Sequence, residues 1–332
     1  MPTAREILSG DARAAARLMR DLDDGLPSAM RTLKSLYRHT GRAHIVGITG
    51  APGVGKSTIA GRLVAVLRGR EKTVGVVAVD PTSPVTGGAL LGDRVRMQEH
   101  ANDPEVFIRS LATRGRLGGL SRSTLGIVHV MDAMGKDVIL VETVGAGQDA
   151  VEIARVAHTN IVVVAPGLGD DVQAMKAGIL EIADIFAVNK SDRDGADRVR
   201  REIEAMIAMG GHAEGSWIPP VVSTVASEGT GISLLWEEAE RHRAHLCGDG
   251  DPVGLRRERV REELVELLKC RLAEKAMEEL ERRGMLEPLL AAMAGGKTDP
   301  YSAAGKIAGE LIGARRKGSG ARKARSRGEG RR

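Results

Sequence analysis

Aromatic residues and cysteines are scarce in this chain of 332 residues. It contains two Trp, two Tyr and two Phe, whereas proteins that bind single-stranded nucleic acid stack the bases on aromatic side chains. Its two cysteines, Cys247 and Cys270, lie far apart in the sequence and form no CxxC unit. This composition excludes a base-stacking platform, a disulfide framework and a cysteine-rich zinc site.

Long hydrophobic runs are also missing. No apolar stretch approaches the roughly 18 residues that a membrane-spanning helix needs. Charged residues such as Arg5, Glu6 and Asp11 interrupt the N-terminus before any apolar stretch forms, which argues against a secretory signal or a transit peptide. We therefore expect a cytoplasmic globular protein without a membrane partner.

Positive charge is concentrated in the C-terminal tail. The net charge is +5, but residues 315–332 hold nine Lys or Arg against one acid, Glu329, so the rest of the chain is net negative. A Gly-, Ser- and Arg-rich segment buries little apolar surface, which predicts a disordered, solubilising tail. Weak binding of the tail to RNA or to a membrane is the alternative, and we expect no nucleic-acid partner for the folded part.

Glycine, in contrast, is abundant, with 42 residues, and apolar strand-like runs alternate with helical stretches. The expected strands are Ile45–Thr49, Val74–Val79, Val106–Arg109, Val138–Val141, Ile161–Ala165, Ile185–Val188 and Ile218–Val222. The expected helices between them are Thr58–Arg68, Ser121–Met134, Val172–Ala183 and Asp197–Met209. Continuous Val/Ile runs separated by helices predict an α/β fold with a doubly wound, mostly parallel sheet. Helices precede it (Ala12–Leu22, Pro27–Tyr37) and follow it (Ile232–His245, Val260–Arg283, Tyr301–Leu311).

A phosphate-binding motif follows the first expected strand. The run Gly50-Ala51-Pro52-Gly53-Val54-Gly55-Lys56-Ser57, continued by Thr58, matches G-x-x-x-x-G-K-[ST] between a strand and a helix. Glycines let the backbone N–H groups of such a loop point at phosphate oxygens, the lysine neutralises the β and γ charges, and the serine hydroxyl binds Mg²⁺. The motif predicts a nucleotide-binding P-loop.

The base of that nucleotide is indicated by a second motif. Asn189-Lys190-Ser191-Asp192 follows an expected strand, about 130 residues after the P-loop. A carboxylate at Asp192 can accept from both N–H groups on the edge of guanine, whereas adenine offers the wrong pattern. The sequence favours GTP over ATP.

Two further acids lie at the ends of expected strands. Asp80 follows Val76–Val79, and Glu142 follows Val138–Val141 and opens the sequence Glu142-Thr143-Val144-Gly145. Each could instead cap the next helix. Because strand ends meet in one crevice of an open α/β sheet, we predict that both acids act with Lys56 and Ser57 at a Mg²⁺ site.

At this point a family resemblance becomes specific. It is carried by the runs Asp80 to Arg94, Arg109 to Gly115, Leu117 to Ser121 and Glu142 to Gly145. These residues closely resemble the MeaB/ArgK family of G-protein chaperones of methylmalonyl-CoA mutase and related adenosylcobalamin enzymes. The resemblance extends to Asp299–Ala304, which is similar to the family's C-terminal dimerisation segment.

The resemblance implies roles that spacing alone does not. It implies two switches, one from Asp80 to Arg94 with Asp80 and Asp93 near Mg²⁺, and one from Glu142 to Gln148. Pro166–Lys176 resembles a third switch that couples nucleotide state to the mutase. Within it, the cation of Lys176 could exchange partners between Asp170 or Asp171 and a group nearer the nucleotide, although an exposed helical lysine is an equal alternative. Gln148 is a candidate for positioning the hydrolytic water, although a solvated Gln at a helix start is an equal alternative.

The loop after the last expected strand departs from the family pattern. Where the family has Thr-x-Ser-Ala, this chain has Ser223-Thr224-Val225-Ala226, so Val225 replaces a hydroxyl and Ala226 retains its backbone N–H for the guanine edge.

Together with the motifs, the resemblance implies a homodimeric GTPase of slow intrinsic turnover. It would gate cofactor loading or protection of a cobalamin-dependent acyl-CoA mutase. The expected parts are an N-terminal helical segment (1–41), a P-loop GTPase domain (42–246), a helical dimerisation region (247–314) and the basic tail (315–332).

Two alternatives remain at this level. One is a protein or amino-acid kinase of transport-system type, but no kinase catalytic-loop sequence is present. The other is a nickel-delivery GTPase, which would need a His-rich tract or a Cys-His cluster. His242 and His245 are three apart on an expected helix, and we predict that they form a solvated face.

Overall fold

The computed structural model describes residues 2–80, 100, 102–112, 119–143, 156–167, 179–211, 213, 215–248 and 252–310. The chain divides into two compact units, Met1–Arg257 and Glu258–Arg332.

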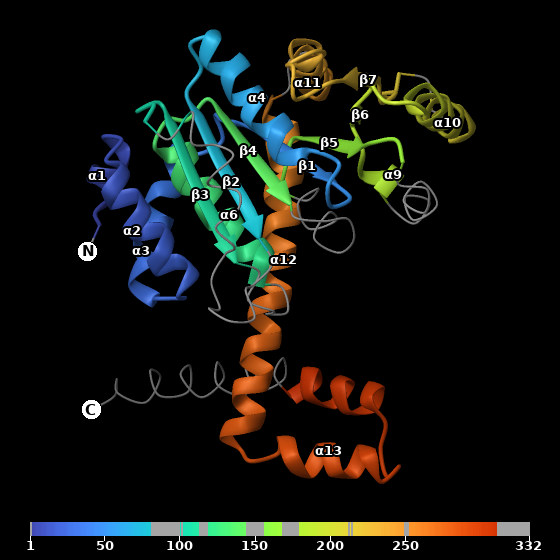
Figure 1. The fold of residues 1–332 in the computed structure, drawn as a ribbon. Helices are drawn as coiled ribbons and strands as arrows, with labels where there is room; N and C mark the ends of the chain where they lie inside the picture. Colours follow the sequence, from blue (N-terminus) through green and yellow to red (C-terminus); the bar gives the residue numbers. More distant parts are fainter. Residues whose placement is uncertain are drawn as a thin grey trace, which may run out of the picture. The chain divides into compact units, whose positions relative to one another are not determined.

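The first unit is built on one seven-stranded parallel sheet. Its strands are β1 (His44–Gly50), β2 (Val74–Asp80), β3 (Val106–Ala112), β4 (Val138–Thr143), β5 (Thr159–Val164), β6 (Ile185–Asn189) and β7 (Val221–Thr224). The order β3-β2-β4-β1-β5-β6-β7 places β1 at the centre, between β4 and β5 (Figure 1). The strand order reverses at β1, so the loop after β1 lies where open α/β sheets bind ligands. The predicted doubly wound sheet is confirmed, and every pairing in it is parallel.

Helices cover both faces because the strands are apolar on both faces. The helices of this unit that flank the sheet are α4 (Lys56–Gly69), α6 (Gly119–Ala133), α9 (Ile179–Ile182), α10 (Ala196–Met209) and α11 (Ile232–Cys247). Val74 and Val76 of β2 pack in one core cluster with α4 and α11, whereas Val77 and Val79 pack in another with α6. The alternation along one strand therefore builds two separate apolar layers.

Three N-terminal helices pack outside α6. They are α1 (Ala4–Leu8), α2 (Ala12–Asp23) and α3 (Pro27–Leu36), followed by the short 3₁₀ helix η1 (Tyr37–His39). Thr3 and Glu6 form a capping box on α1, and Asp11 caps α2 by accepting from two backbone N–H groups. Their buried side chains, such as Ile7 and Leu18, join the core cluster of α6.

One expected strand begins later than predicted. The sequence suggested Ile218–Val222, but β7 runs from Val221 to Thr224. Pro219 and Pro220 have no N–H to donate to a ladder, although Pro220 O still accepts from Phe186 N at 2.9 Å. The apolar run was therefore wrong as a guide to the start of this strand.

The second unit is helical. It contains most of α12 (Pro252–Arg282), then α13 (Leu286–Ala294) and a helix over residues 300–310. Leu280 and Ala303 are buried within it, whereas Leu264, Leu268 and Leu272 are exposed at four-residue spacing on α12. An exposed leucine row on one side of a long helix is typical of a surface that binds a partner.

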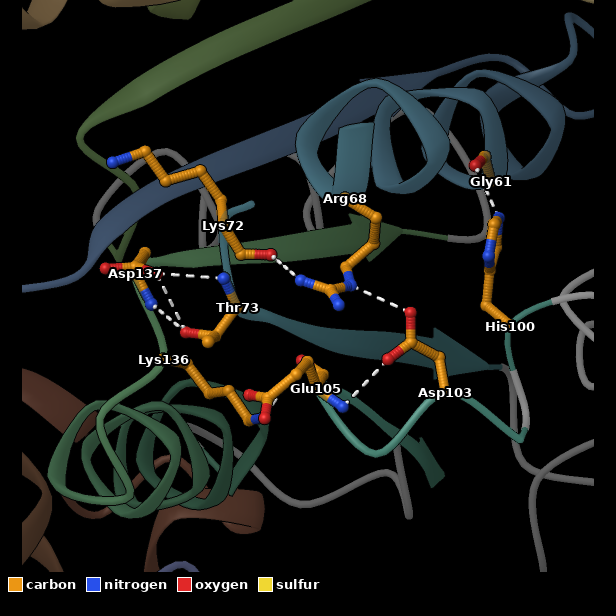
Figure 2. A network of polar contacts seen from close by, with 9 residues as sticks. All are labelled: Gly61, Arg68, Lys72, Thr73, His100, Asp103, Glu105, Lys136 and Asp137. Atoms are coloured by element: carbon orange, nitrogen blue, oxygen red, sulfur yellow. Dashed lines mark hydrogen bonds and ion pairs between the residues drawn. The ribbon is translucent and has the colours of Figure 1, made fainter. Parts of the chain in front are cut away.

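A polar network fixes the edge of the sheet where β2 and β3 begin (Figure 2). Arg68 at the end of α4 donates to Asp103 Oδ2 and Lys72 O, both at 2.8 Å. Thr73 donates from its backbone N and its hydroxyl to Asp137 Oδ2, at 2.8 and 3.0 Å. These bonds join the loops that precede β2, β3 and β4.

A second polar network lies at the start of β5 and β6, and it corrects the prediction for His242. This residue is 3% exposed, not solvated. Its Nδ1 lies 3.0 Å from Thr159 Oγ1 and its Nε2 lies 3.3 Å from Asp184 Oδ1, while Trp217 packs on its ring at a centroid distance of 4.9 Å. His245 is the exposed member of the pair.

Burial moves the pKa values of this pair in opposite directions. Burial raises the pKa of Asp184 to about 6, although hydrogen bonds from Asn160 lower it in part. Burial, reinforced by the charge of His245, lowers the pKa of His242 to about 4. At neutral pH the network therefore holds an ionised carboxylate beside a neutral imidazole.

We expect Asp184→Asn to make acid destabilisation steeper. Folded Asp184 holds its proton up to about pH 6, so its contribution to stability falls as pH rises from 3.8 to 6. In the unfolded chain His242 takes up a proton below about pH 6.5, whereas in the folded protein it stays neutral down to about pH 4. The contribution of His242 to the free energy of unfolding is therefore lost as pH falls from 6.5 towards 4. Each contribution is about 3 kcal/mol, and in the wild type they offset each other. Urea unfolding at pH 4.5 and 7 would measure the difference, and parallel pH profiles for variant and wild type would contradict it.

Candidate functional site

The loop between β1 and α4 follows a path that side chains would obstruct. Gly50, Gly53 and Gly55 all have positive φ, at 146°, 80° and 101°. A Cβ on Gly50 would lie 2.1 Å from Val163 O, and one on Gly55 would lie 2.3 Å from Asn189 Nδ2. Glycine is therefore required at both positions for conformation and for space.

The loop ends at the first residues of α4. Gly55 is the N-cap residue, so the free N–H groups and the positive dipole end of α4 open towards the loop. Lys56 is 5% exposed, and its Nζ donates to Gly50 O and Ala51 O, both at 2.9 Å. A buried cation, a helix N-terminus and a glycine-rich loop together form a site for a multiply charged anion.

Oxygen ligands gather beside this anion site. Ser57 Oγ donates to Glu142 Oε1 at 2.5 Å, and Glu142, near the end of β4, is 3% exposed. The next residue of β4, Thr143, donates from its hydroxyl to Thr49 Oγ1 of β1 at 3.1 Å. A hydroxyl and a carboxylate are hard oxygen ligands of the kind that Mg²⁺ prefers, so the residues present fit that ion.

Asn189, at the end of β6, connects the glycine-rich loop to the end of β7 and the loop after it. Its Nδ2 donates to Val54 O of the glycine-rich loop at 2.7 Å. Its Oδ1 accepts from Ala226 N at 3.0 Å and from Thr224 Oγ1 at 3.2 Å. Because Asn189 is 3% exposed, both ends of its amide are used inside the protein.

Lys190 also supports the glycine-rich loop, and Asp192 does not. Lys190 adopts a left-handed φ of 56° and donates from Nζ to Gly53 O at 2.7 Å. Asp192 is exposed three residues after the end of β6. Its carboxylate is therefore accessible to a ligand on the same side of the sheet as Lys56.

Arg62 was not identified from the sequence, although it supports this site from α4. Its Nε donates to Ala226 O at 3.1 Å and its Nη2 donates to Ser227 O at 2.6 Å. Thr224, also missed, supplies a hydroxyl to Asn189 one residue before Val225. The only available signal for Arg62 was its position six residues after Lys56 on the same helix.

Several predicted site residues lie outside the described residues. These are Asp93, Gln148, Asp170, Asp171 and Lys176, and the basic tail lies there as well. Asp80 ends β2, and its side chain is not described. The structure thus brings together Gly50 to Thr58, Glu142, Asn189, Lys190, Val225 and Ala226 at one edge of the sheet.

The cluster that a metal carrier would need is not found among the described residues. Within these ranges, no group of three or more His, Cys, Asp or Glu side chains is arranged to hold a metal ion. Cys247 and Cys270 are both free thiols. In the same ranges, no helix is both long and apolar enough to cross a membrane.

The family match and the similar proteins agree on one family for this chain. The family described as methylmalonyl-CoA mutase-associated GTPase MeaB matches residues 15–281. A Pyrococcus abyssi protein whose name refers to a GTPase is 47% identical over 306 residues, which cover 92% of this chain and 94% of that protein. The Escherichia coli GTPase ArgK is 34% identical over 253 residues, which cover 74% of this chain and 76% of that protein.

A solved structure supports the fold. The crystal structure of an LAO/AO transport system kinase superposes with a TM-score of 0.70 and covers 93% of this chain and 96% of its own. Its sequence identity is 23%, so the likeness concerns the fold.

Proposed function

The chain belongs to the MeaB family of methylmalonyl-CoA mutase-associated GTPases, and from this premise we propose that it binds and hydrolyses GTP to control a cobalamin-dependent acyl-CoA mutase. The observation that carries the nucleotide part is the buried Lys56 beside the glycine-rich loop, with Ser57 and Glu142 next to it. Loss of activity on replacing Lys56 tests it.

The phosphates would lie in the loop from Gly50 to Ser57. There the N–H groups at the start of α4 donate to phosphate oxygens, and Lys56 exchanges its two carbonyl partners for the β and γ oxygens. The lysine then stabilises the charge that spreads over the γ-phosphoryl group in the transition state.

Mg²⁺ would be held by Ser57, with Glu142, Asp80 and Asp93 around it. The ion neutralises phosphate charge when bound. Ser57 and Glu142 already contact each other at 2.5 Å, so the carboxylate orients the hydroxyl. Gln148 is the residue proposed to position the attacking water. If this positioning is incomplete without the partner, the intrinsic rate of GTP hydrolysis is slow.

Guanine would be recognised by Asp192 and by the loop after β7. Asn189 ties that loop to the phosphate loop, so the base site and the phosphate site form one rigid frame. The Ala226 N–H, which the sequence assigns to the base, donates to Asn189 Oδ1 in this structure. Ala226 and Val225 therefore act as a wall of the base pocket that Asn189 and Arg62 hold in position.

We expect Arg62→Gln to weaken guanine nucleotide binding about tenfold, the value of one or two charge-assisted hydrogen bonds. The change removes the donors to Ala226 O and Ser227 O and leaves Lys56 and Asp192 in place. Equilibrium titration with GDP measures the affinity. Arg198→Gln, an exposed change on α10 with the same loss of charge, is the matched control. Equal affinity in the Arg62 variant and the control would remove Arg62 from base recognition.

Dimer formation is proposed for the helical second unit. Leu264, Leu268 and Leu272 are exposed in a row on α12, and Tyr301, in the segment that resembles the family's dimerisation element, is 88% exposed. Two such leucine rows from two copies would cover each other.

Partner coupling is assigned to the segment around Asp170, Asp171 and Lys176. If the two nucleotide states bind the mutase differently, linkage requires the mutase to change nucleotide affinity or turnover.

We expect a cobalamin-dependent acyl-CoA mutase to stimulate GTP hydrolysis by the wild type, and Lys176→Ala to blunt that stimulation while basal hydrolysis stays nearly intact. Hydrolysis is measured for both proteins with and without the mutase, and Lys297→Ala serves as an exposed control. Equal stimulation of both proteins would remove Lys176 from the mechanism. Stimulation by no tested mutase would count against the chaperone function, while leaving the GTPase assignment intact.

A further inference from the structure

A cavity of about 470 Å³ lies at the opposite edge of the sheet from the P-loop. Arg42 and His44 reach it from the start of β1, about 20 Å from the loop at the other end of that seven-residue strand. Lys72 reaches it from the loop before β2, and Trp236 and Arg243 reach it from α11. Its volume falls within the range of small-molecule sites.

Arg42, Lys72 and Arg243 are the cations that line this cavity. Among the described residues, no carboxylate pairs with Arg42, Lys72 or Arg243, and the one recorded contact of these three side chains runs from Arg243 Nη2 to Arg42 O at 3.3 Å. In Figure 2 the side chain of Lys72 points away from the network that holds its backbone carbonyl. Three cations from three different elements thus face one space.

The two acids that line the cavity are already engaged. Asp137 accepts from the backbone N and the hydroxyl of Thr73, and Glu240 accepts from Arg70 at 2.9 Å. These partners partly neutralise the two carboxylates, so the cavity has more hydrogen-bond donors than available acceptors. Each carboxylate still has a second oxygen with which to accept a hydroxyl.

Trp236 supplies an aromatic wall of the cavity and carries a buried donor. It is 2% exposed, lines the cavity, and its Nε1–H is buried without a hydrogen-bond partner in the described structure. Buried Trp N–H groups normally find an acceptor, because an unmatched donor is destabilising. Because the indole lines the cavity, its fluorescence can report on a ligand bound there.

We propose that this cavity binds a phosphorylated, hydroxylated small molecule, with the phosphate held by Arg42, Lys72 and Arg243. Guanidinium groups match phosphate geometry with two parallel donors, and the lysine adds a third charge. The space exceeds that of a bare phosphate, and the free carboxylate oxygens of Asp137 and Glu240 suit hydroxyl groups. The site is separate from the P-loop and does not depend on the identity of the nucleotide bound there.

Ribose 5-phosphate is a suitable probe. The full-length protein is first saturated with GDP and Mg²⁺, so that the P-loop is closed to the probe, and binding is followed by calorimetry. We expect saturable binding at one site, weaker binding of inorganic phosphate, and none of ribose. Arg42→Gln and Arg243→Gln should each weaken binding at least tenfold. Arg241→Gln, two residues away on α11 and paired with Glu238, changes the net charge equally and should leave binding unchanged.

A spectroscopic signal locates the probe. In a Trp217→Phe background Trp236 is the sole tryptophan, so its fluorescence should change on binding. Three results would each overturn the proposal: no binding to the wild type, equal weakening by Arg241→Gln and the cavity variants, or binding without a change in Trp236 fluorescence. Ribose 5-phosphate binding no tighter than inorganic phosphate would overturn the assignment of a hydroxylated ligand.

Discussion

Lys56→Ala is expected to reduce GTP hydrolysis by at least 10²- to 10³-fold, the usual effect of removing one preorganised charge-stabilising group from a reaction centre. The side chain is buried beside the phosphate loop and donates to Gly50 O and Ala51 O. Lys190 also contacts this loop, through an exposed hydrogen bond to Gly53 O at 2.7 Å, but it does not occupy the buried position of Lys56. Phosphate release measured over time at saturating GTP gives the rate.

The same variant needs a test of folding, because Lys56 also holds its own loop together. Urea unfolding distinguishes a folded, inactive protein from a destabilised one. Lys34→Ala, on the exposed side of α3, is the control and should retain wild-type activity. Wild-type hydrolysis by the folded Lys56 variant would refute the P-loop assignment.

Asp192→Asn should lower the affinity for GTP by roughly 10²-fold and permit binding of xanthosine triphosphate. A carboxylate accepts from two N–H groups of guanine, whereas an amide can accept one and must present a donor to the other. Xanthine carries a carbonyl in place of the exocyclic amine, so it suits the amide donor. Competition of both triphosphates against a fluorescent GDP analogue measures the switch.

Asp194→Asn provides the matched control for this experiment. Asp194 is exposed in the same loop, so the change removes an equal charge. If the Asp192 variant binds GTP as the control does, Asp192 does not read the base, and the selectivity must come from the loop after β7.

Most of the fold could be predicted from the sequence, because the buried strands of a parallel sheet have continuous apolar sequences. β1, β4 and β6 lie within two residues of their expected bounds at each end. The errors came where another effect acted, as with the prolines before β7. His242 continues the apolar spacing of Leu235 and Ala239 on α11, and this spacing was the sign of its burial.

The candidate site was predictable as far as its motifs are continuous in sequence. The residues of the P-loop and of the run from Asn189 to Asp192 are contiguous in the sequence, and their side-chain types indicate which part of the nucleotide they bind. Arg62 and Thr224 act on residues that are distant in sequence or act through another side chain. Such contacts form when α4 meets the loop after β7 and when β6 pairs with β7, which no spacing along one strand or helix reveals.

The central position of β1 has a consequence for how the chain is made. Its neighbours in the sheet begin at Val138 and Thr159, so β1 leaves the ribosome long before either exists. At about 5–20 residues per second, the interval between the end of β1 and the end of β5 lasts on the order of ten seconds. During that time the phosphate loop has no Val163 carbonyl to pack against and no Asn189 to hold it. The complete nucleotide site can thus form only after β6 has been synthesised. Until then, the apolar side chains of β1 depend on the N-terminal helices for cover.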